Sequence, residues 1–301
     1  NSIRAIEVDG VIMQDSTTTN IDFGTNGFYL PFDGNSPIGE DKSGKGNDWA
    51  PVNFGAAALD KATGALPILN TVSGGNYATV GVRTDAYAND LVLALPLVGN
   101  KEDVSNQINS GSSTKTVTTT NAVASSAISN FYGGSWYFDG SGDHVNVTSS
   151  DIAPGTGDFT LECWVYFDSA DSTLDTIVET RSSTSASDGF LIGRFQTSGH
   201  QNKIEFYTAS DYRVTADVTT LNDTWVHVAA VRSSSVTKLY INGRAQSTTY
   251  SDTNNYSNDD LIIGENVGAL YQLDGYVQDF RIYVGTAKYT SDFIPASTNP
   301  D

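Results

Sequence analysis

The chain has 301 residues, and 16 Lys and Arg against 35 Asp and Glu give it a formal net charge of −19. The basic residues are spread along the sequence, which excludes a positively charged groove for nucleic acid and disfavours docking on an anionic membrane. No apolar run approaches the ~20 residues of a membrane-spanning helix. The single cysteine, Cys163, excludes a disulfide within the chain and a cysteine-based zinc cluster, and its apolar neighbours predict a small buried side chain.

The first part of the chain, residues 1–89, has few apolar runs and long connections rich in Gly, Ala and Ser. Within it, Ile3–Met13 is expected to form a hairpin around Asp9-Gly10, because such a pair tolerates the positive φ angles of a two-residue turn. The rest of the region lacks the apolar residues for a convincing core. We therefore expect an irregular, β-poor connecting or assembly region that packs on the rest of the chain, on a neighbouring subunit or on parts of a longer polypeptide.

From residue 90 to residue 301 the sequence predicts an all-β domain. Lys203–Tyr207 alternates polar and apolar residues, as a half-buried antiparallel strand does, and Asn242-Gly243 is the clearest hairpin turn. The stretch Asn109–Ser129, rich in Ser, Thr, Ala and Asn, predicts one strand with a long loop. The number of strands exceeds that of a seven-stranded immunoglobulin fold and predicts two larger sheets. The predicted strands are Leu91–Leu97, Lys115–Thr119, Ser135–Phe138, His144–Val147, Phe159–Phe167, Thr176–Thr180, Phe190–Phe195, Lys203–Thr208, Tyr212–Ala216, Trp225–Arg232, Val236–Ile241, Ser247–Tyr250, Leu261–Ile263 and Tyr276–Val284.

Five aromatic-rich segments follow one another in a recognisable order: Ser135–Asp143, Phe159–Val165, Trp225–Val231, Leu239–Gly243 and Gly275–Tyr283. In this order they resemble a laminin G-like, concanavalin A-like jelly roll, which is an antiparallel β-sandwich that usually binds a sugar or a protein surface. Leu91–Pro295 is similar to the versions of this domain in structural proteins of tailed bacteriophages, and its end, Arg281–Pro295, resembles them closely. Arg4–Val11 resembles the last strand of a preceding module, and Gly24–Leu30 with Asp41–Trp49 resembles a connecting segment of phage tail and appendage proteins.

The resemblance implies a non-enzymatic structural protein of the virion. It would be a fibre, appendage or decoration protein that presents a binding module to a host-surface glycan or to another virion protein. By analogy with phage fibres, it also implies a homo-oligomer, a trimer, in an extracellular particle. Two alternatives stay open. One is a lectin or depolymerase that acts on host glycan, and the other is a purely structural capsid or tail component without a ligand.

The sequence shows little sign of catalytic chemistry, and we expect no enzymatic activity. Related sandwich hydrolases place acidic residues at alternate positions of one strand, where two carboxylates share a face. Glu162 stands alone among apolar neighbours, and Glu179 follows Asp175 at an even spacing without a third acid. The three histidines lie in different contexts, and His227 is expected to be an ordinary strand residue. No nucleophile elbow or phosphate-binding loop is present.

One turn is a candidate calcium site. Asp139 and Asp143 bracket Gly140-Ser141-Gly142, and such a turn can aim both carboxylates at one Ca²⁺. The resemblance adds Asp279, because some jelly rolls of this type hold calcium between this turn and the closing strand. The alternative is that Asp139 and Asp143 only cap the hairpin.

Four tyrosines near predicted loops and strand ends are candidate sugar-binding residues: Tyr207, Tyr212, Tyr250 and Tyr256. An aromatic face can stack on a sugar while neighbouring polar groups hold its hydroxyls. The alternative for each tyrosine is packing at a sheet edge or an interface. Trp136, Trp164 and Trp225 lie within predicted strands, and we assign them to the core.

Overall fold

The computed structural model describes residues 7–8, 11–12, 23–30, 41–49, 85, 87–130, 133–168, 174–218, 221–293 and 295. Near the start, strands β1 (Glu7–Val8) and β2 (Val11–Ile12) pair in antiparallel fashion with Val8 opposite Val11, which confirms the predicted hairpin. In the described part of the chain, no helix is long and apolar enough to span a bilayer. The division between residues 1–89 and 90–301 stays a prediction.

The Asp41 carboxylate ties together two short segments, residues 23–30 and 41–49. It accepts hydrogen bonds from the backbone N–H groups of Tyr29 at 2.8 Å, Ser43 at 2.8 Å and Asn47 at 2.9 Å. Beside these bonds, Phe28 and Trp49 are 42% and 56% exposed, and their ring centroids lie 4.8 Å apart. The two segments therefore form a hydrogen-bonded pair of loops that presents an aromatic surface.

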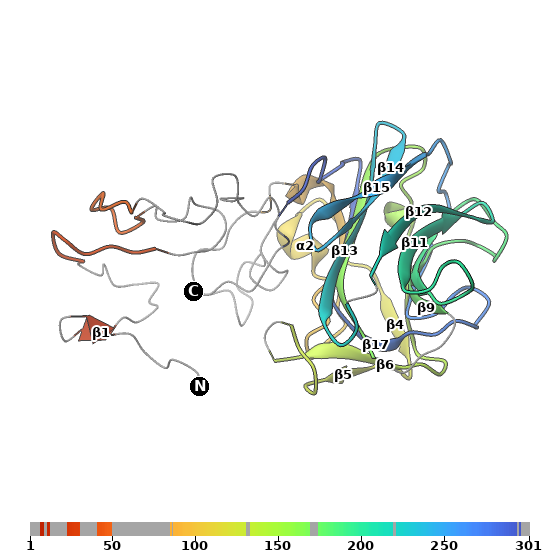
Figure 1. Cartoon of the computed structure of the whole chain (residues 1–301), viewed down its shortest axis with the longest axis horizontal. Coiled ribbons are helices and arrows are strands. Elements are labelled where there is room, and N and C mark those ends of the chain that lie inside the picture. Colours follow the sequence, from red (N-terminus) through yellow and green to blue (C-terminus); the bar gives the residue numbers. More distant parts are fainter. Residues whose placement is uncertain are drawn as a thin grey trace.

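The other strands form two antiparallel sheets packed face to face (Figure 1). The seven-stranded sheet consists, in spatial order, of β12 (Asp211–Asp217), β11 (Lys203–Thr208), β10 (Leu191–Phe195), β9 (Leu174–Glu179), β16 (Asp260–Ile263), β7 (His144–Thr148) and β4 (Val117–Thr120). The eight-stranded sheet consists of β15 (Arg244–Ser251), β14 (Val236–Ile241), β13 (Trp225–Ser233), β8 (Phe159–Phe167), β17 (Asp274–Val284), β6 (Ser135–Asp139) and β5 (Val123–Ser125), while β3 (Leu91–Leu95) pairs with the second half of β17.

This arrangement confirms the predicted all-β antiparallel sandwich. Strand β5 lies in a stretch for which the sequence predicts a loop. The short helices η1 (Ala88–Asp90), α2 (Ser105–Ile108) and η2 (Ser150–Ile152) lie in the connections.

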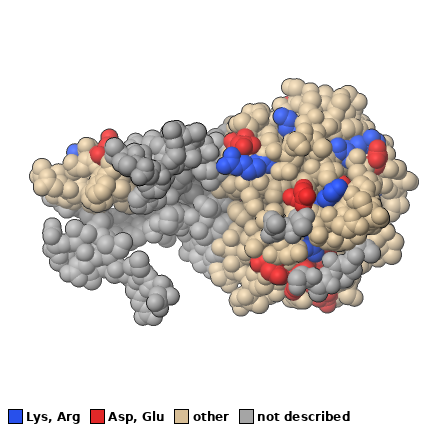
Figure 2. Space-filling model, in the orientation of Figure 1, with Lys and Arg blue, Asp and Glu red and all other residues tan. Residues whose placement is uncertain are grey.

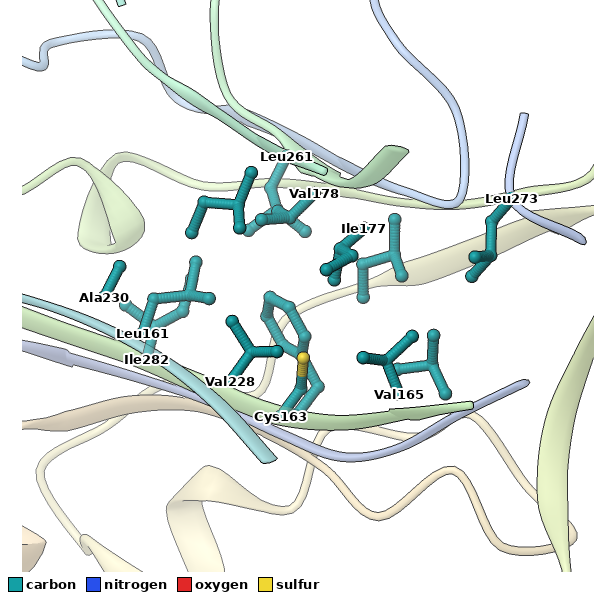
Figure 3. Close-up of a cluster of buried hydrophobic side chains, with 14 of the residues drawn as sticks. Leu161, Cys163, Val165, Ile177, Val178, Val228, Ala230, Leu261, Leu273 and Ile282 are labelled. Carbon is teal, nitrogen blue, oxygen red and sulfur yellow. The ribbon is translucent and has the colours of Figure 1, made fainter. Parts of the chain in front are cut away.

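Alternate side chains of both sheets fill the space between them (Figure 3). Leu161, Cys163 and Val165 of β8 point into this core, where Ile177 and Val178 of β9 also lie. Burial raises the pKa of the Cys163 thiol because the thiolate is disfavoured in an apolar environment. The side chain is therefore the small buried group that the sequence predicts.

The segment after β17 folds back over the outer face of the eight-stranded sheet. The rings of Tyr289 and Phe293 stack with centroids 3.4 Å apart, and they pack in a cluster with Ala229, Val231 and Tyr240. The segment therefore covers the outer face at Ala229 and Val231 of β13 and at Tyr240 of β14.

Candidate functional site

The structure brings together two of the four predicted tyrosines, Tyr207 and Tyr212, on the outer face of the seven-stranded sheet. Tyr207 of β11 lies opposite Tyr212 of β12, and the ring centroids are 5.1 Å apart. Alternation explains the outward position of Tyr207, because its neighbour Phe206 points into the core, whereas a bulge in β12 between Tyr212 and Val214 turns Tyr212 outward. Both tyrosines are half-buried and therefore retain exposed ring surface.

A stacked histidine and a buried carboxylate lie beside Tyr212. The His200 ring stacks on Tyr212 with centroids 3.9 Å apart, and its side chain is 29% exposed. Nδ1 of His200 lies 2.9 Å from both oxygens of Glu205, which is fully buried. Thr215 donates a further hydrogen bond of 2.8 Å to Glu205. The carboxylate thus fixes the orientation of the imidazole against the tyrosine.

An arginine is held against Tyr207 in a similar way. The Arg181 guanidinium lies 4.9 Å from the centroid of the Tyr207 ring. It donates two hydrogen bonds to Glu179, at 2.9 and 2.6 Å, and both side chains are buried. We call Tyr207, Tyr212, His200, Glu205 and Arg181 the tyrosine face. Half-exposed rings beside fixed polar groups can hold a ring-shaped ligand that carries hydroxyl groups.

The other two predicted tyrosines do not join the tyrosine face. Tyr256 is 1% exposed and packs against Phe159 and Phe190 in the core, so its prediction as a ligand-binding residue is wrong. Burial raises its pKa, and its hydroxyl donates to the Asp252 carboxylate. Tyr250 is half-buried on β15, where the Arg213 guanidinium covers its ring at 5.1 Å.

The three aspartates of the predicted calcium site do not converge. Asp143 accepts a 2.9 Å hydrogen bond from the N–H of Asp139, and Asp139 accepts one from the N–H of Ser141, so both cap the hairpin. Asp279 binds the Arg281 guanidinium at 2.9 Å. It lies five residues along β17 from Asp274, the partner of Asp139, which is a separation of roughly 16 Å along a strand.

Across the described residues, no group of three or more His, Cys, Asp or Glu side chains is placed to hold a metal ion. The prediction that these three aspartates form one calcium site is therefore wrong, because their carboxylates do not converge. Binding of calcium by the protein stays a prediction.

The even spacing of Asp175 and Glu179 does not place them on one face. A bulge in β9 opposite Ile192 and Gly193 of β10 reverses the alternation between the two acids. Asp175 binds Arg194 at 2.7 Å, and the Arg194 guanidinium lies over the core ring of Phe167. Glu179 instead points outward to the tyrosine face. The two carboxylates cannot act on one glycosidic bond from this arrangement.

Glu162 has apolar neighbours in the sequence, but the fold brings polar partners to it. Its carboxylate binds Lys288 Nζ at 2.5 Å and the Tyr289 hydroxyl at 2.7 Å, and His227 Nε2 lies at 3.3 Å. Burial alone would raise the pKa of Glu162. The charge of Lys288, the hydrogen bond from His227 and the charge of Arg281 reverse this effect, and the pKa lies well below 4.5. This buried network anchors the chain segment that follows β17.

Two of the three tryptophans are outside the core. Trp136 is 7% exposed and belongs to the core, as expected, but Trp164 and Trp225 are half-buried on the outer face of the eight-stranded sheet. The signal was present in the sequence. Cys163 and Val165 point inward, so period-two alternation places Trp164 on the opposite face.

Comparisons with known proteins support the fold. Residues 139–288 match the family model described as the concanavalin A-like lectin/glucanases superfamily. A mutant of the protein HCR/D is 13% identical, with a TM-score of 0.50, and the match covers 67% of this chain and 50% of that one. The binding domain of botulinum neurotoxin serotype D is 15% identical, with a TM-score of 0.49 and the same coverage.

Domain 4 of an extracellular arabinanase from Geobacillus stearothermophilus, solved with arabinotriose, is 13% identical with a TM-score of 0.48, and the match covers 66% of this chain and 94% of that domain. The matched region spans about half the length of the first two structures. No curated protein matches the sequence. The sandwich thus has the concanavalin A-like jelly-roll fold, which rests on its sheet topology, on the family match and on the structure with a TM-score of 0.50.

Proposed function

We propose that this chain is a non-enzymatic binding module whose tyrosine face holds a glycan. The observation that carries the proposal is the pairing of Tyr207 with Tyr212 beside His200 and Arg181, both of which are held by buried carboxylates. Sugar rings stack on half-exposed aromatic faces, while fixed polar groups select the pattern of hydroxyl groups. The family match to a superfamily of lectins and glucanases supports a sugar as the ligand.

The absence of enzymatic activity is part of this proposal. Asp175 and Glu179 point to opposite sides of their sheet, and each is bound by an arginine. A retaining glycosidase instead needs two carboxyl groups about 5 Å apart on one face. Incubation of a bound polysaccharide with the protein should therefore release no new reducing ends, and their appearance would contradict this part of the proposal.

We further propose that the module belongs to a tailed-phage virion and displays the sandwich on an appendage of the particle. The sequence resemblance of Arg281–Pro295 and Asp41–Trp49 supports this setting. The exposed rings of Phe28 and Trp49 offer an apolar contact for assembly with copies of the chain or with other virion proteins. Display of several copies would multiply weak glycan contacts. Antibody labelling of particles in electron micrographs tests the setting, and particles without label would contradict it.

Binding to the tyrosine face can be tested with an oligosaccharide array followed by calorimetric titration of the strongest hit. We expect Tyr212→Ala to weaken that affinity about tenfold, because the stacking surface is lost. Tyr212→Phe should retain most of the affinity, since it keeps the ring. The control is Tyr166→Ala, which removes a half-buried tyrosine from the outer face of the other sheet. An array without hits, or equal losses in Tyr212→Ala and Tyr166→Ala, would overturn the proposal.

A further inference from the structure

Four aromatic side chains form a row across the outer face of the eight-stranded sheet. Tyr137 of β6 lies opposite Tyr276 of β17, Tyr276 lies opposite Tyr166 of β8, and Tyr166 lies opposite Trp225 of β13. The neighbouring ring centroids are 4.9, 5.8 and 5.8 Å apart. We call these four residues the aromatic row. Three interstrand steps make it roughly 14 Å long.

The aromatic row is part of the surface. Tyr137, Tyr166 and Trp225 are half-buried, and Tyr276 at the centre is 8% exposed. The core residues next to them, such as Phe138 and Val165, point to the other side of the sheet. The segment after β17 packs on Ala229, and its Phe293 ring lies 5.7 Å from the His227 ring, so it reaches the outward-facing position next to Trp225. The row therefore lies on the part of the outer face that retains exposed aromatic surface.

Four aspartates lie in a second line beside the row, each two residues from one of its members. They are Asp139 next to Tyr137, Asp274 next to Tyr276, Asp168 next to Tyr166 and Asp223 next to Trp225. Asp139 and Asp274 are strand residues, whereas Asp168 follows β8 and Asp223 lies in the turn before β13. Because neighbouring strands are antiparallel, all four lie toward the same end of the sheet. Asp139 and Asp274 are direct cross-strand partners. Two carboxylates in such a position make this end of the sheet strongly negative.

The electrostatic effect of these carboxylates reaches the tyrosine hydroxyl groups. Burial raises the pKa of Tyr137, and the charges of Asp274 and Asp139 raise it further. The pKa of Tyr166 is raised by burial and then by Asp223 and Asp168. The aromatic faces themselves carry negative π density. Both components of the surface therefore favour a positively charged ligand.

We propose that the aromatic row and its line of aspartates form a docking surface for a basic segment of a partner protein. Arginine or lysine side chains of that segment would lie against the rings through cation–π contacts and would pair with the aspartates. The length of the row accommodates more than one such side chain. A second copy of this chain is disfavoured as the occupant of this surface, because its 16 Lys and Arg are spread along the sequence and form no basic segment. The surface lies on the opposite sheet from the tyrosine face, so this partner is independent of the proposed glycan.

Fluorescence anisotropy with a labelled hexa-arginine peptide tests the proposal on the full chain. We expect Trp225→Ala to weaken binding roughly fivefold, which is within the range of cation–π contacts, and Trp225→Phe to restore most of the affinity. Asp274→Asn should weaken binding about threefold through loss of one ion pair. Its control is Asp259→Asn, which removes the same charge from an exposed site in the loop before β16 of the other sheet and should stay within about 1.5-fold of the wild type.

The pair of asparagine variants decides the result even if Trp225→Ala fails to fold. Equal weakening by Asp274→Asn and Asp259→Asn would show that the peptide follows net charge alone and would overturn the proposal. The same holds if neutral cellohexaose competes with the peptide for the wild-type protein, because the row would then be a sugar platform. The proposal would also be overturned if Tyr212→Ala lost affinity for the peptide while Trp225→Ala kept it, because the peptide would then bind the seven-stranded sheet.

Discussion

At the scale of single residues, five buried carboxylates serve the fold through ion pairs with buried cations. The pairs in which both side chains are nearly inaccessible are Glu162–Lys288, Asp175–Arg194, Glu179–Arg181, Asp279–Arg281 and Asp252–Arg232. Removal of one partner from such a pair leaves an uncompensated charge in a medium of low dielectric constant. Glu162 is the most connected of these acids, because Tyr289 and His227 also approach it.

Replacement of Lys288 by methionine should destabilise the protein by about 3–5 kcal/mol at pH 7, because Glu162 would stay buried without its ammonium partner. Denaturant unfolding followed by tryptophan fluorescence measures the change. The matched control is Lys238→Met, which alters a half-exposed lysine on β14 and should change stability by less than about 0.5 kcal/mol. Similar losses in both variants would contradict a specific role for the Glu162 pair.

The Glu162–Lys288 pair also determines how stability changes with pH. The pKa of Glu162 lies well below its ordinary value of 4.5 in the folded protein, so its ionised form stabilises the fold above pH 4.5. That contribution is lost as the pH falls below 4.5 and toward the folded pKa. Lys288→Met should therefore lose less stability than the wild type between pH 5 and pH 3. Parallel acid profiles for the two proteins would show that other carboxylates control acid unfolding.

The sequence predicts that Tyr207 points outward, but it predicts neither what this residue touches nor the outward position of Tyr212, which depends on a bulge in β12. Alternation alone places Tyr207 on the outer face of the sheet, because its neighbour Phe206 points into the core. The partner of Glu162 is 126 residues away, and no local pattern reports such a contact. The prediction of Tyr256 as a binding residue failed for a related reason, because a polar loop sequence does not reveal that its ring enters the core.

At the scale of elements, three two-residue hairpin turns in the described part of the chain have positive φ at both central residues. Asn242-Gly243 has φ of 48° and 77° and joins β14 to β15, as its sequence predicts. Ala209-Ser210 and Ser234-Ser235 adopt the same left-handed region without a glycine or asparagine. A residue with a Cβ atom pays roughly 1 kcal/mol for this conformation. These two turns are therefore imposed by the strands that they connect.

Substitution of Ser235 by glycine should stabilise the protein by about 0.5–1 kcal/mol, because Ser235 has φ of 63° and glycine removes the strain. The contrasting variant is Ser247→Gly, which lies within β15 and should destabilise by a similar amount through the added freedom of the unfolded chain. Thermal unfolding by calorimetry resolves both changes. A lower melting temperature for Ser235→Gly would show that the hydroxyl or Cβ of Ser235 makes a stabilising contact.

The strands themselves were largely predictable, because most alternate between the core and an outer face. Phe159–Phe167 and Lys203–Thr208 have the predicted bounds. Bulges were not predictable. The bulge in β9 separates Asp175 from Glu179, and Asp279 has φ of 55° at an irregularity of β17. Each reverses the side-chain alternation by one residue, so a carboxylate pair inferred from even spacing can lie on opposite faces.

At the scale of the whole molecule, the negative charge is mostly on the surface while the attractive pairs are mostly internal. On the face shown in Figure 2, Lys and Arg side chains are scattered and form no broad basic patch. The exposed ion pairs in the described part of the chain include Arg213–Asp211 and Arg244–Asp292. Such pairs contribute little, whereas a net charge of −19 repels itself in the compact state.

An increase in NaCl from 0.02 to 0.5 M should therefore raise the melting temperature at pH 7 by roughly 2–6 °C, which corresponds to about 1–2 kcal/mol for a protein of this size. Salt screens exposed charges over a Debye length of a few ångströms to a few tens of ångströms, but it screens the buried pairs much less. The repulsion thus weakens more than the attraction. The internal control is the same titration at pH 5, closer to the sequence pI of about 4.2, where the gain should shrink because fewer carboxylates are charged. A melting temperature that falls with salt at pH 7 would show that exposed ion pairs, and not net repulsion, dominate the electrostatics of the sandwich.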